Sequence, residues 1–198
     1  IDDFSESLPF LVQEWIPGDD RRIQFSALYF DRGIPAARFD GRKLESLPAA
    51  LGQAIVVESF PDDEVYESTV RFFADLNLSG PVSLELKRAP DGRLWVIEPT
   101  IGRTDTHFQA WLANGVNTAL IEYRRVLGLP AEAASQTTEK IWFDTERDPL
   151  CFLRHARHEG LLSLWKRADF PYVGTSDYRP TARATFVMFR DYIRRRLS

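Results

Sequence analysis

The feature that most constrains the fold of this chain is an Asp91-Gly92 pair between two stretches of alternating apolar residues. In that setting an Asp-Gly pair is a strong signal for a β-hairpin with a two-residue loop. With these two residues in the loop, Glu85 faces Glu98 across the strands, and Thr100 lies one step further on the same side. The sequence therefore predicts two carboxylates side by side on one face of a hairpin.

Two facing carboxylates need a compensating positive charge. Directly opposed Cβ atoms lie about 4.5 to 5.5 Å apart, and like charges at that spacing cost stability. Oxygen ligands favour a hard cation such as Mg²⁺, which accepts one or two carboxylates together with substrate phosphates. A nucleotide is then the expected partner. The alternative is a pair of glutamates that simply face water, and a longer loop with a bulge would separate them.

The other side of the hairpin is apolar and is expected to face a core. It carries Leu84, Leu86, Trp95 and Ile97. The site would then sit on a rigid sheet.

The start of the chain adds a second motif, Gln13-Glu-Trp-Ile-Pro-Gly-Asp-Asp20, followed by strand-like stretches at 22–30 and 34–39. Together with the hairpin, this order of motifs resembles the ATP-grasp superfamily, and within it the carboxylate-amine ligases. The resemblance runs from about Leu11 to Pro130. It implies an α+β fold, the ATP-grasp C-terminal lobe, with a mostly antiparallel sheet packed with helices.

The resemblance implies a nucleotide site at the N-terminal motif. In the family, a strand of this form is the hinge on which adenine lies, and a following acidic residue meets the ribose. The matching positions here are Gln13, Glu14, Trp15, Ile16 and Asp20.

The resemblance also assigns the metal to the hairpin, because the family holds its metal ions on two paired late strands. Glu85, Glu98 and Thr100 fall at those positions, with Thr100 in place of the usual asparagine. Ile101-Gly102-Arg103 loosely replaces the usual proline and arginine, and Arg103 is the candidate that steadies an acyl phosphate.

A basic pair, Arg42 and Lys43, lies in a stretch resembling the segment that passes the phosphates in related ligases. Both are candidates for anion contacts, and Arg42 is a second candidate for the acyl phosphate. The alternative is that a basic pair beside a glycine turn is merely solvated.

The activity implied by the resemblance is ATP-dependent ligation of a small-molecule carboxylate to an amine through an acyl phosphate, with ATP and Mg²⁺ or Mn²⁺ as cofactors. Two other classes stay open, namely a noncatalytic nucleotide-binding descendant and a structural or interaction module. The family's earlier lobe has no counterpart here. The chain is therefore expected to be a C-terminal lobe fragment whose missing partner is the upstream lobe of the same protein.

Two regions are expected, with residues 1–130 forming the hinge and catalytic lobe and 131–198 a mainly helical extension packed on it. Strands are predicted at 9–16, 22–30, 34–39, 54–59 and 141–143. Helices are predicted at 63–77 and at 106–127, with a break near Asn114-Gly115, and 131–139 reads as a linker. A last helix carries an apolar stripe, expected to dock, and basic residues largely off it. The stripe is Phe186, Phe189, Ile193 and Leu197, and the basic residues are Arg190, Arg194, Arg195 and Arg196.

Composition favours an ordinary globular protein, with 44% hydrophobic and 27% charged residues and a net charge of -4. The single cysteine, Cys151, excludes an internal disulfide and is expected as a buried thiol, and no zinc spacing is present. The slight acidity argues against nonspecific nucleic-acid binding as the main role of the protein, and no nucleic-acid partner is expected. Without an apolar run long enough to span a membrane or a visible secretory signal, a cytoplasmic protein is expected.

Overall fold

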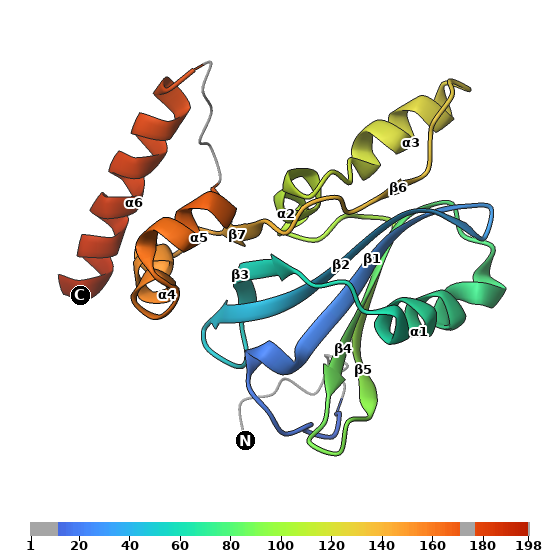
Figure 1. Cartoon of the computed structure of the whole chain (residues 1–198), viewed down its shortest axis with the longest axis horizontal. Coiled ribbons are helices and arrows are strands. Elements are labelled where there is room, and N and C mark those ends of the chain that lie inside the picture. The colour runs from blue at the N-terminus through green and yellow to red at the C-terminus, as the bar shows by residue number, and fades with distance from the viewer. Residues whose placement is uncertain (1–11, 171–176, 198) are drawn as a thin grey trace, which may run out of the picture.

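The computed structural model describes residues 12–170 and 177–197. Within these residues the chain has an α+β fold built on one mainly antiparallel eight-stranded sheet, as expected (Figure 1). The strand order is β5-β4-β1-β2-β3-β7-β8, with β6 beside β2. The strands are β1 (Ile23–Asp31), β2 (Ile34–Leu47), β3 (Gln53–Ser59), β4 (Gly80–Arg88), β5 (Leu94–Ile101), β6 (Ala134–Ser135), β7 (Ile141–Phe143) and β8 (Ala168–Asp169).

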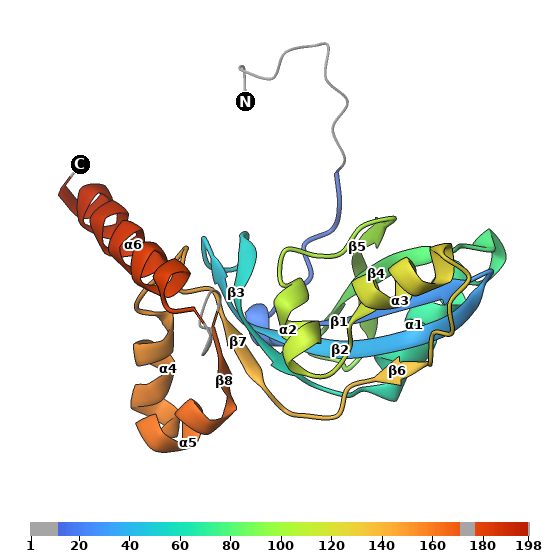
Figure 2. The ribbon, with the colours of Figure 1, turned by 90° about the horizontal axis from the view of Figure 1, so that it is seen from above.

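The helices lie on both faces of the sheet and at its β7 end (Figures 1 and 2). They are α1 (Asp63–Phe73), α2 (Phe108–Ala113), α3 (Thr118–Val126), α4 (Cys151–Glu159), α5 (Leu161–Arg167) and α6 (Arg179–Leu197), with short 3₁₀ turns η1 (Asp20–Arg22) and η2 (Ala74–Leu76). The helical prediction for 106–127, broken near Asn114-Gly115, is confirmed by α2 and α3.

Two separate cores form on the two faces of the central strands. On one face, Leu28, Leu84 and Leu86 pack with Val65 and Phe73 of α1. On the other face, the core includes Phe25, Ala27, Tyr29, Phe39, Trp111 of α2 and Ile121 of α3. Because strand residues alternate between faces, this division assigns each strand side chain to the α1 side or the α2 side.

Helix α1 is determined by its own sequence. The Asp62 carboxylate accepts hydrogen bonds from the backbone amides of Glu64 and Val65 at 3.0 and 3.3 Å, which caps the first turn. Asp63 and Glu64 place negative charge at the positive end of the helix. The predicted helix at 63–77 is confirmed, with η2 extending it to Leu76.

Strand β2 runs further than the predicted 34–39, because Gly41 is not in a turn. Gly41 pairs with Phe25 of β1, and a Cβ atom at Gly41 would lie 2.4 Å from Cζ of the Phe25 ring. The glycine therefore leaves room for a buried aromatic ring. The strand continues through Arg42 and Lys43 to Leu47.

The segment before β1 differs from the prediction of a strand at 9–16. Residues 12–16 have no regular secondary structure, and residues 9–11, with the Leu11 start of the resemblance, lie outside the described residues.

Residues 131–139 are attached to the sheet and are not a free linker. β6 pairs in parallel with Ala37 and Arg38 of β2. The Gln136 side chain accepts from the Asp40 amide at 2.6 Å and donates to the Asp40 carbonyl at 3.0 Å. The strand predicted at 141–143 is confirmed as β7, which pairs with β3.

Helices α4 and α5 form a third core against β3 and β7. Cys151, Phe152 and Leu164 pack there with Phe143. Burial raises the pKa of the Cys151 thiol to about 12, so it stays protonated and inert, as expected of a buried thiol.

Helix α6 presents its expected apolar stripe to solvent. Phe186, Phe189 and Ile193 are exposed, so the prediction of a docked stripe is wrong for these three residues. The side chains of Arg195, Arg196 and Leu197 lie outside the described set. Over residues 12–170 and 177–197, no helix combines the length and the apolar content needed to cross a bilayer.

Candidate functional site

The hairpin of β4 and β5 sets Glu85 opposite Glu98 and Ser83 opposite Thr100, as predicted. The strand pairing near the turn, however, differs from the predicted pairing. Near the turn, Arg88 pairs with Leu94, one residue out of the predicted pairing. A bulge that leaves Ile97 without a partner then restores the predicted register before Glu98.

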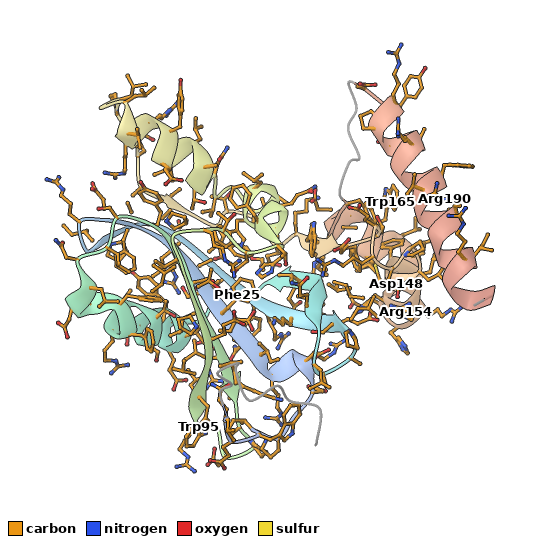
Figure 3. The ribbon with its side chains drawn as sticks, turned by 180° about the vertical axis from the view of Figure 1, so that it is seen from behind. Phe25, Trp95, Asp148, Arg154, Trp165 and Arg190 are labelled. Carbon is orange, nitrogen blue, oxygen red and sulfur yellow. The ribbon has the colours of Figure 1, made fainter. Side chains whose placement is uncertain are left out.

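The bulge also changes which side chains face the core. Leu84 and Leu86 are buried as expected, but Trp95 pairs with Lys87 and is 38% exposed. Leu94 packs against the α1 core instead. Figure 3 shows Trp95 near the turn end of the hairpin, far from Phe25. The prediction that Trp95 faces the core is therefore wrong.

Lys43 supplies the positive charge that the glutamate pair needs. Its Nζ lies 2.7 Å from Oε2 of Glu85. The two side chains are 8% and 17% exposed, so the pair is largely shielded from water. A charge-assisted hydrogen bond in such a setting is stronger than one on the surface.

These residues line a cavity of about 440 Å³ on the α2 side of the sheet. Its polar wall includes Lys43, Glu85, Glu98, Thr100, Arg103, Asp105 and His107. Its apolar wall includes Leu47, Pro48, Leu51 and Ala54, from the end of β2 to the start of β3. The structure thus brings together the three predicted metal ligands, Lys43 and Arg103.

Arg42 is the predicted site residue that the structure does not bring to the cavity. Adjacent strand residues point to opposite faces, so Arg42 points away from the side that Lys43 occupies. Its guanidinium pairs with Glu58 and lies 4.0 Å from the centroid of the Phe60 ring. The expectation of an anion contact at Arg42 is therefore not supported by its position.

The segment of residues 12–19 lies beside the hairpin on the same side as the cavity. The Gln13 amide donates to the carbonyl of the bulged residue Ile97 at 3.5 Å. Lys87 Nζ lies 4.8 Å from the centroid of the Trp15 ring, which is 60% exposed. Because Lys87 and Glu85 are two residues apart on one strand, an exposed aromatic face lies next to the carboxylate pair.

The other three hinge candidates differ in exposure. Glu14 is exposed and Ile16 is buried. Asp20 is also buried, and its Oδ2 accepts from the Ser46 amide at 2.8 Å. Asp20 therefore anchors η1 to β2 in this structure.

Two further residues of the cavity, Asp105 and His107, are not among the predicted site residues. His107 is 3% exposed, and its ring centroid lies 4.6 Å from that of Phe25. Burial lowers the pKa of His107 to about 4, against the opposing effect of Glu85. Burial also raises the pKa of Asp105, opposed by the nearby Ser83 hydroxyl and the charge of Arg103. A lone histidine without spacing to a partner offers no sequence signal for this position.

The acidic side chains of the cavity would need further oxygen ligands to hold a metal ion. The described residues contain no cluster of three or more His, Cys, Asp or Glu side chains suited to hold a metal alone. Glu85 and Glu98, however, face one another and line one cavity. Two carboxylates are what Mg²⁺ ordinarily takes from a protein when phosphates complete its coordination.

No protein-family model matches the chain, and no curated protein matches it. Solved structures do share its fold. The phosphoribosylaminoimidazole carboxylase ATPase subunit of Aquifex aeolicus is 16% identical with a TM-score of 0.51, covering 61% of this chain and 38% of its own. Biotin carboxylase of Campylobacter jejuni, solved as a βγ-ATP complex, is 14% identical with a TM-score of 0.52. The match covers 65% of this chain and 30% of the carboxylase chain.

A third structure is N5-carboxyaminoimidazole synthase of Aspergillus clavatus, with ADP and 5-aminoimidazole ribonucleotide bound. It is 10% identical with a TM-score of 0.50, covering 70% of this chain and 40% of its own. These are ATP-grasp proteins, so the chain has part of an ATP-grasp fold. It spans well under half the length of each of the three.

Proposed function

We propose that this chain is the magnesium- and ATP-binding lobe of an enzyme that joins a carboxylate to an amine through an acyl phosphate. The observation that carries the proposal is the shared cavity in which Glu85 and Glu98 face one another and Lys43 reaches Glu85. The shared fold supports the same assignment, because two of the solved structures that have it are complexes, one with βγ-ATP and one with ADP.

Phosphoryl transfer requires neutralisation of the phosphate charge and an in-line arrangement of the reacting oxygens. Magnesium, bound with ATP, supplies that neutralising charge and orients the phosphates. Glu85 and Glu98 would hold it, and the Thr100 hydroxyl adds an oxygen beside them. Lys43, once Glu85 is engaged, offers its ammonium to the phosphates. Manganese, with similar oxygen preferences, is an alternative ion.

In the reaction, an oxygen of the carboxylate attacks the γ-phosphorus and ADP leaves, which yields the acyl phosphate. The amine then attacks the acyl carbon, the bond from that carbon to the phosphate oxygen breaks, and inorganic phosphate leaves while the amine gives up a proton to the phosphate or to water. Arg103, which lines the cavity, would steady the acyl phosphate. No protein side chain forms a covalent intermediate in this scheme.

The nucleotide base is assigned to the segment beside the hairpin. The exposed Trp15 ring offers a stacking surface, and Gln13, Glu14 and Ile16 offer backbone groups along the same segment. Asp20 would need to exchange its bond to the Ser46 amide for a ribose hydroxyl. We therefore assign Asp20 a contact only in the nucleotide-bound state.

A second candidate is a noncatalytic nucleotide-binding protein. The ion pair between Lys43 and Glu85 favours it, because a metal carboxylate is already neutralised there. Thr100 in place of the family's asparagine points the same way. Phosphate release that depends on an added amine would exclude this candidate.

The deciding experiment is a thermal-shift titration with ATP, with and without magnesium, on the parent chain and on Glu98→Gln. A ligand at 100 times its Kd stabilises the folded state by about 2.7 kcal/mol. For a chain of this size that raises the Tm by roughly 5 to 11 °C. We expect a magnesium-dependent rise in the parent that is absent in Glu98→Gln.

The matched control is Glu67→Gln, which removes the same charge from the exposed side of α1. It should keep the full rise. An equal rise in all three proteins would show that ATP binds elsewhere and would refute the proposal. If the parent shows no rise, the same titration on a protein that includes the upstream region decides the matter, and no rise there also refutes the proposal.

A further inference from the structure

Two residues of the cavity wall each have a buried polar atom that lacks a partner within the described part of the chain. The two atoms are Oδ2 of Asp105 and Nε2 of His107, and they lie 3.7 Å from each other. That separation is too long for a hydrogen bond between them. The side chains are 12% and 4% exposed, so bulk water does not fully compensate either atom.

Buried polar atoms without a partner are rare, and each requires an explanation. Here both atoms belong to residues that line the cavity, on the segment between β5 and α2. His107 is held in place by its contact with Phe25, whose ring is in turn fixed by the space at Gly41. The two residues are therefore held on a rigid part of the cavity wall.

The chemistry of the two atoms selects the group that they can bind. An ionised Asp105 only accepts hydrogen bonds, and a neutral imidazole with its proton on Nδ1 accepts at Nε2. One nitrogen with two or three N–H bonds can donate to both at once. The charged side chains of the cavity wall are Lys43 and Arg103 against Glu85, Glu98 and Asp105, which is a net negative charge suited to a cation.

We propose that Asp105 and His107 together bind the amino group of the amine substrate. This proposal rests on the proposed function and extends it by assigning the two substrates to different parts of the cavity. The acid and its phosphate lie toward Lys43 and Arg103, and the amine lies toward Asp105 and His107. The pair is a specificity determinant, because a substrate lacking N–H donors would leave both buried atoms unpaired.

The test uses ammonium as the simplest probe of this chemistry and needs no ATP. The chain has three histidines, so the ring nitrogens of ¹⁵N-histidine-labelled protein give few signals, and His107→Gln assigns those of His107. Ammonium chloride is titrated against potassium chloride at equal ionic strength, since potassium is a cation without N–H donors. We expect a saturable shift of the His107 Nε2 signal with ammonium alone.

Two variants with the same change in charge separate the pair from a general loss of negative charge. Asp105→Asn should weaken the apparent ammonium affinity by about tenfold or more, the size of one charge-assisted hydrogen bond. Glu67→Gln should keep the affinity within about threefold, because Glu67 is exposed on α1, outside the cavity. Equal shifts with potassium, no shift with ammonium, or loss of the shift in Glu67→Gln but not in Asp105→Asn would overturn the assignment.

The outcome is independent of the nucleotide experiment. An ammonium response would retain the amine site even if magnesium-dependent ATP binding is absent both from this chain and from a protein that includes the upstream region, a result that would refute the nucleotide site. The reverse result would retain the nucleotide site and refute the role of Asp105 and His107.

Discussion

Lys43 Nζ contacts Glu85 Oε2 at 2.7 Å although the two residues belong to strands that do not pair. β1 lies between β2 and β4 in the sheet, so the lysine side chain reaches across it on the α2 side. The two central strands that flank β1 are thus joined by an ion pair at the site itself. This relationship makes Lys43 both a structural counter-ion and a candidate ligand for phosphate.

Lys43→Gln should lower the free energy of unfolding by about 2 kcal/mol, because it leaves the largely buried Glu85 carboxylate without its counter-ion. Magnesium should recover part of this loss, since the free carboxylate pair then accepts a divalent cation more readily than in the parent. Urea unfolding with and without magnesium measures both effects. Lys166→Gln, at an exposed position, is the control and should change stability by less than about 0.5 kcal/mol. Equal losses in the two variants would contradict this account of Lys43.

Arg42→Gln and Arg103→Gln should have opposite phenotypes. Arg42→Gln removes the pair with Glu58 and the contact with Phe60, so it should cost about 1 kcal/mol of stability and leave nucleotide affinity unchanged. Arg103→Gln should leave stability unchanged and weaken magnesium-dependent ATP binding by about tenfold. Urea unfolding and ATP titration of both variants provide the comparison. Weaker ATP binding in Arg42→Gln would show that Arg42 does contribute to the nucleotide site.

Stability should fall with acidification through His107. Its pKa is about 4 in the folded chain and about 6.5 when unfolded, so the unfolded state binds the proton more tightly. The contribution is fully present above pH 6.5 and is lost progressively as the pH falls toward 4. Between pH 7.5 and 5 the loss amounts to about 2 kcal/mol.

The measurement is urea unfolding at those two pH values for the parent, His107→Gln and His158→Gln. The loss assigned to His107 should vanish in the first variant. It should persist in the second, since His158 is exposed. A pH dependence that is the same in all three proteins would exclude His107 as its source.

Gly41→Ala should destabilise the protein by about 1 to 3 kcal/mol, because its Cβ would overlap the buried Phe25 ring. Phe25→Leu shortens that side chain and should relieve the overlap. The double variant is therefore expected to lose about 1 kcal/mol less than the sum of the single losses. Strict additivity in a double-mutant cycle would show that the glycine serves another purpose.

The sequence predicts the class of the fold and the facing glutamates, but the facing pair results from two irregularities that cancel. The turn shifts the pairing by one residue and the unpaired Ile97 shifts it back. Neither irregularity can be inferred from the alternation of apolar and polar residues alone. The same bulge explains why the expected core position of Trp95 was wrong.

Other features depend on contacts between segments far apart in the chain. Asp40-Gly41 has the composition of a turn, and only the Phe25 ring on another strand explains why it is extended. The segment 131–139 has no strand pattern in its sequence. Hydrogen bonds between the Gln136 side chain and the Asp40 backbone attach this segment to the sheet. Asp105 and His107 become candidate site residues only because the fold brings them into the wall of one cavity.

The strand that carries Glu98 has a consequence for motion. Among the described strands, β5 is at the edge of the sheet, bonded to β4 alone, and Pro99 beside Glu98 has no amide hydrogen to donate. Edge segments with few hydrogen bonds open locally at a lower free energy than the core. Transient fraying of β5 would separate the two carboxylates while β4, with Glu85, stays in the sheet. Amide hydrogen exchange should therefore be faster along β5 than along β4, and a ligand that bridges Glu85 and Glu98 should slow it most at β5.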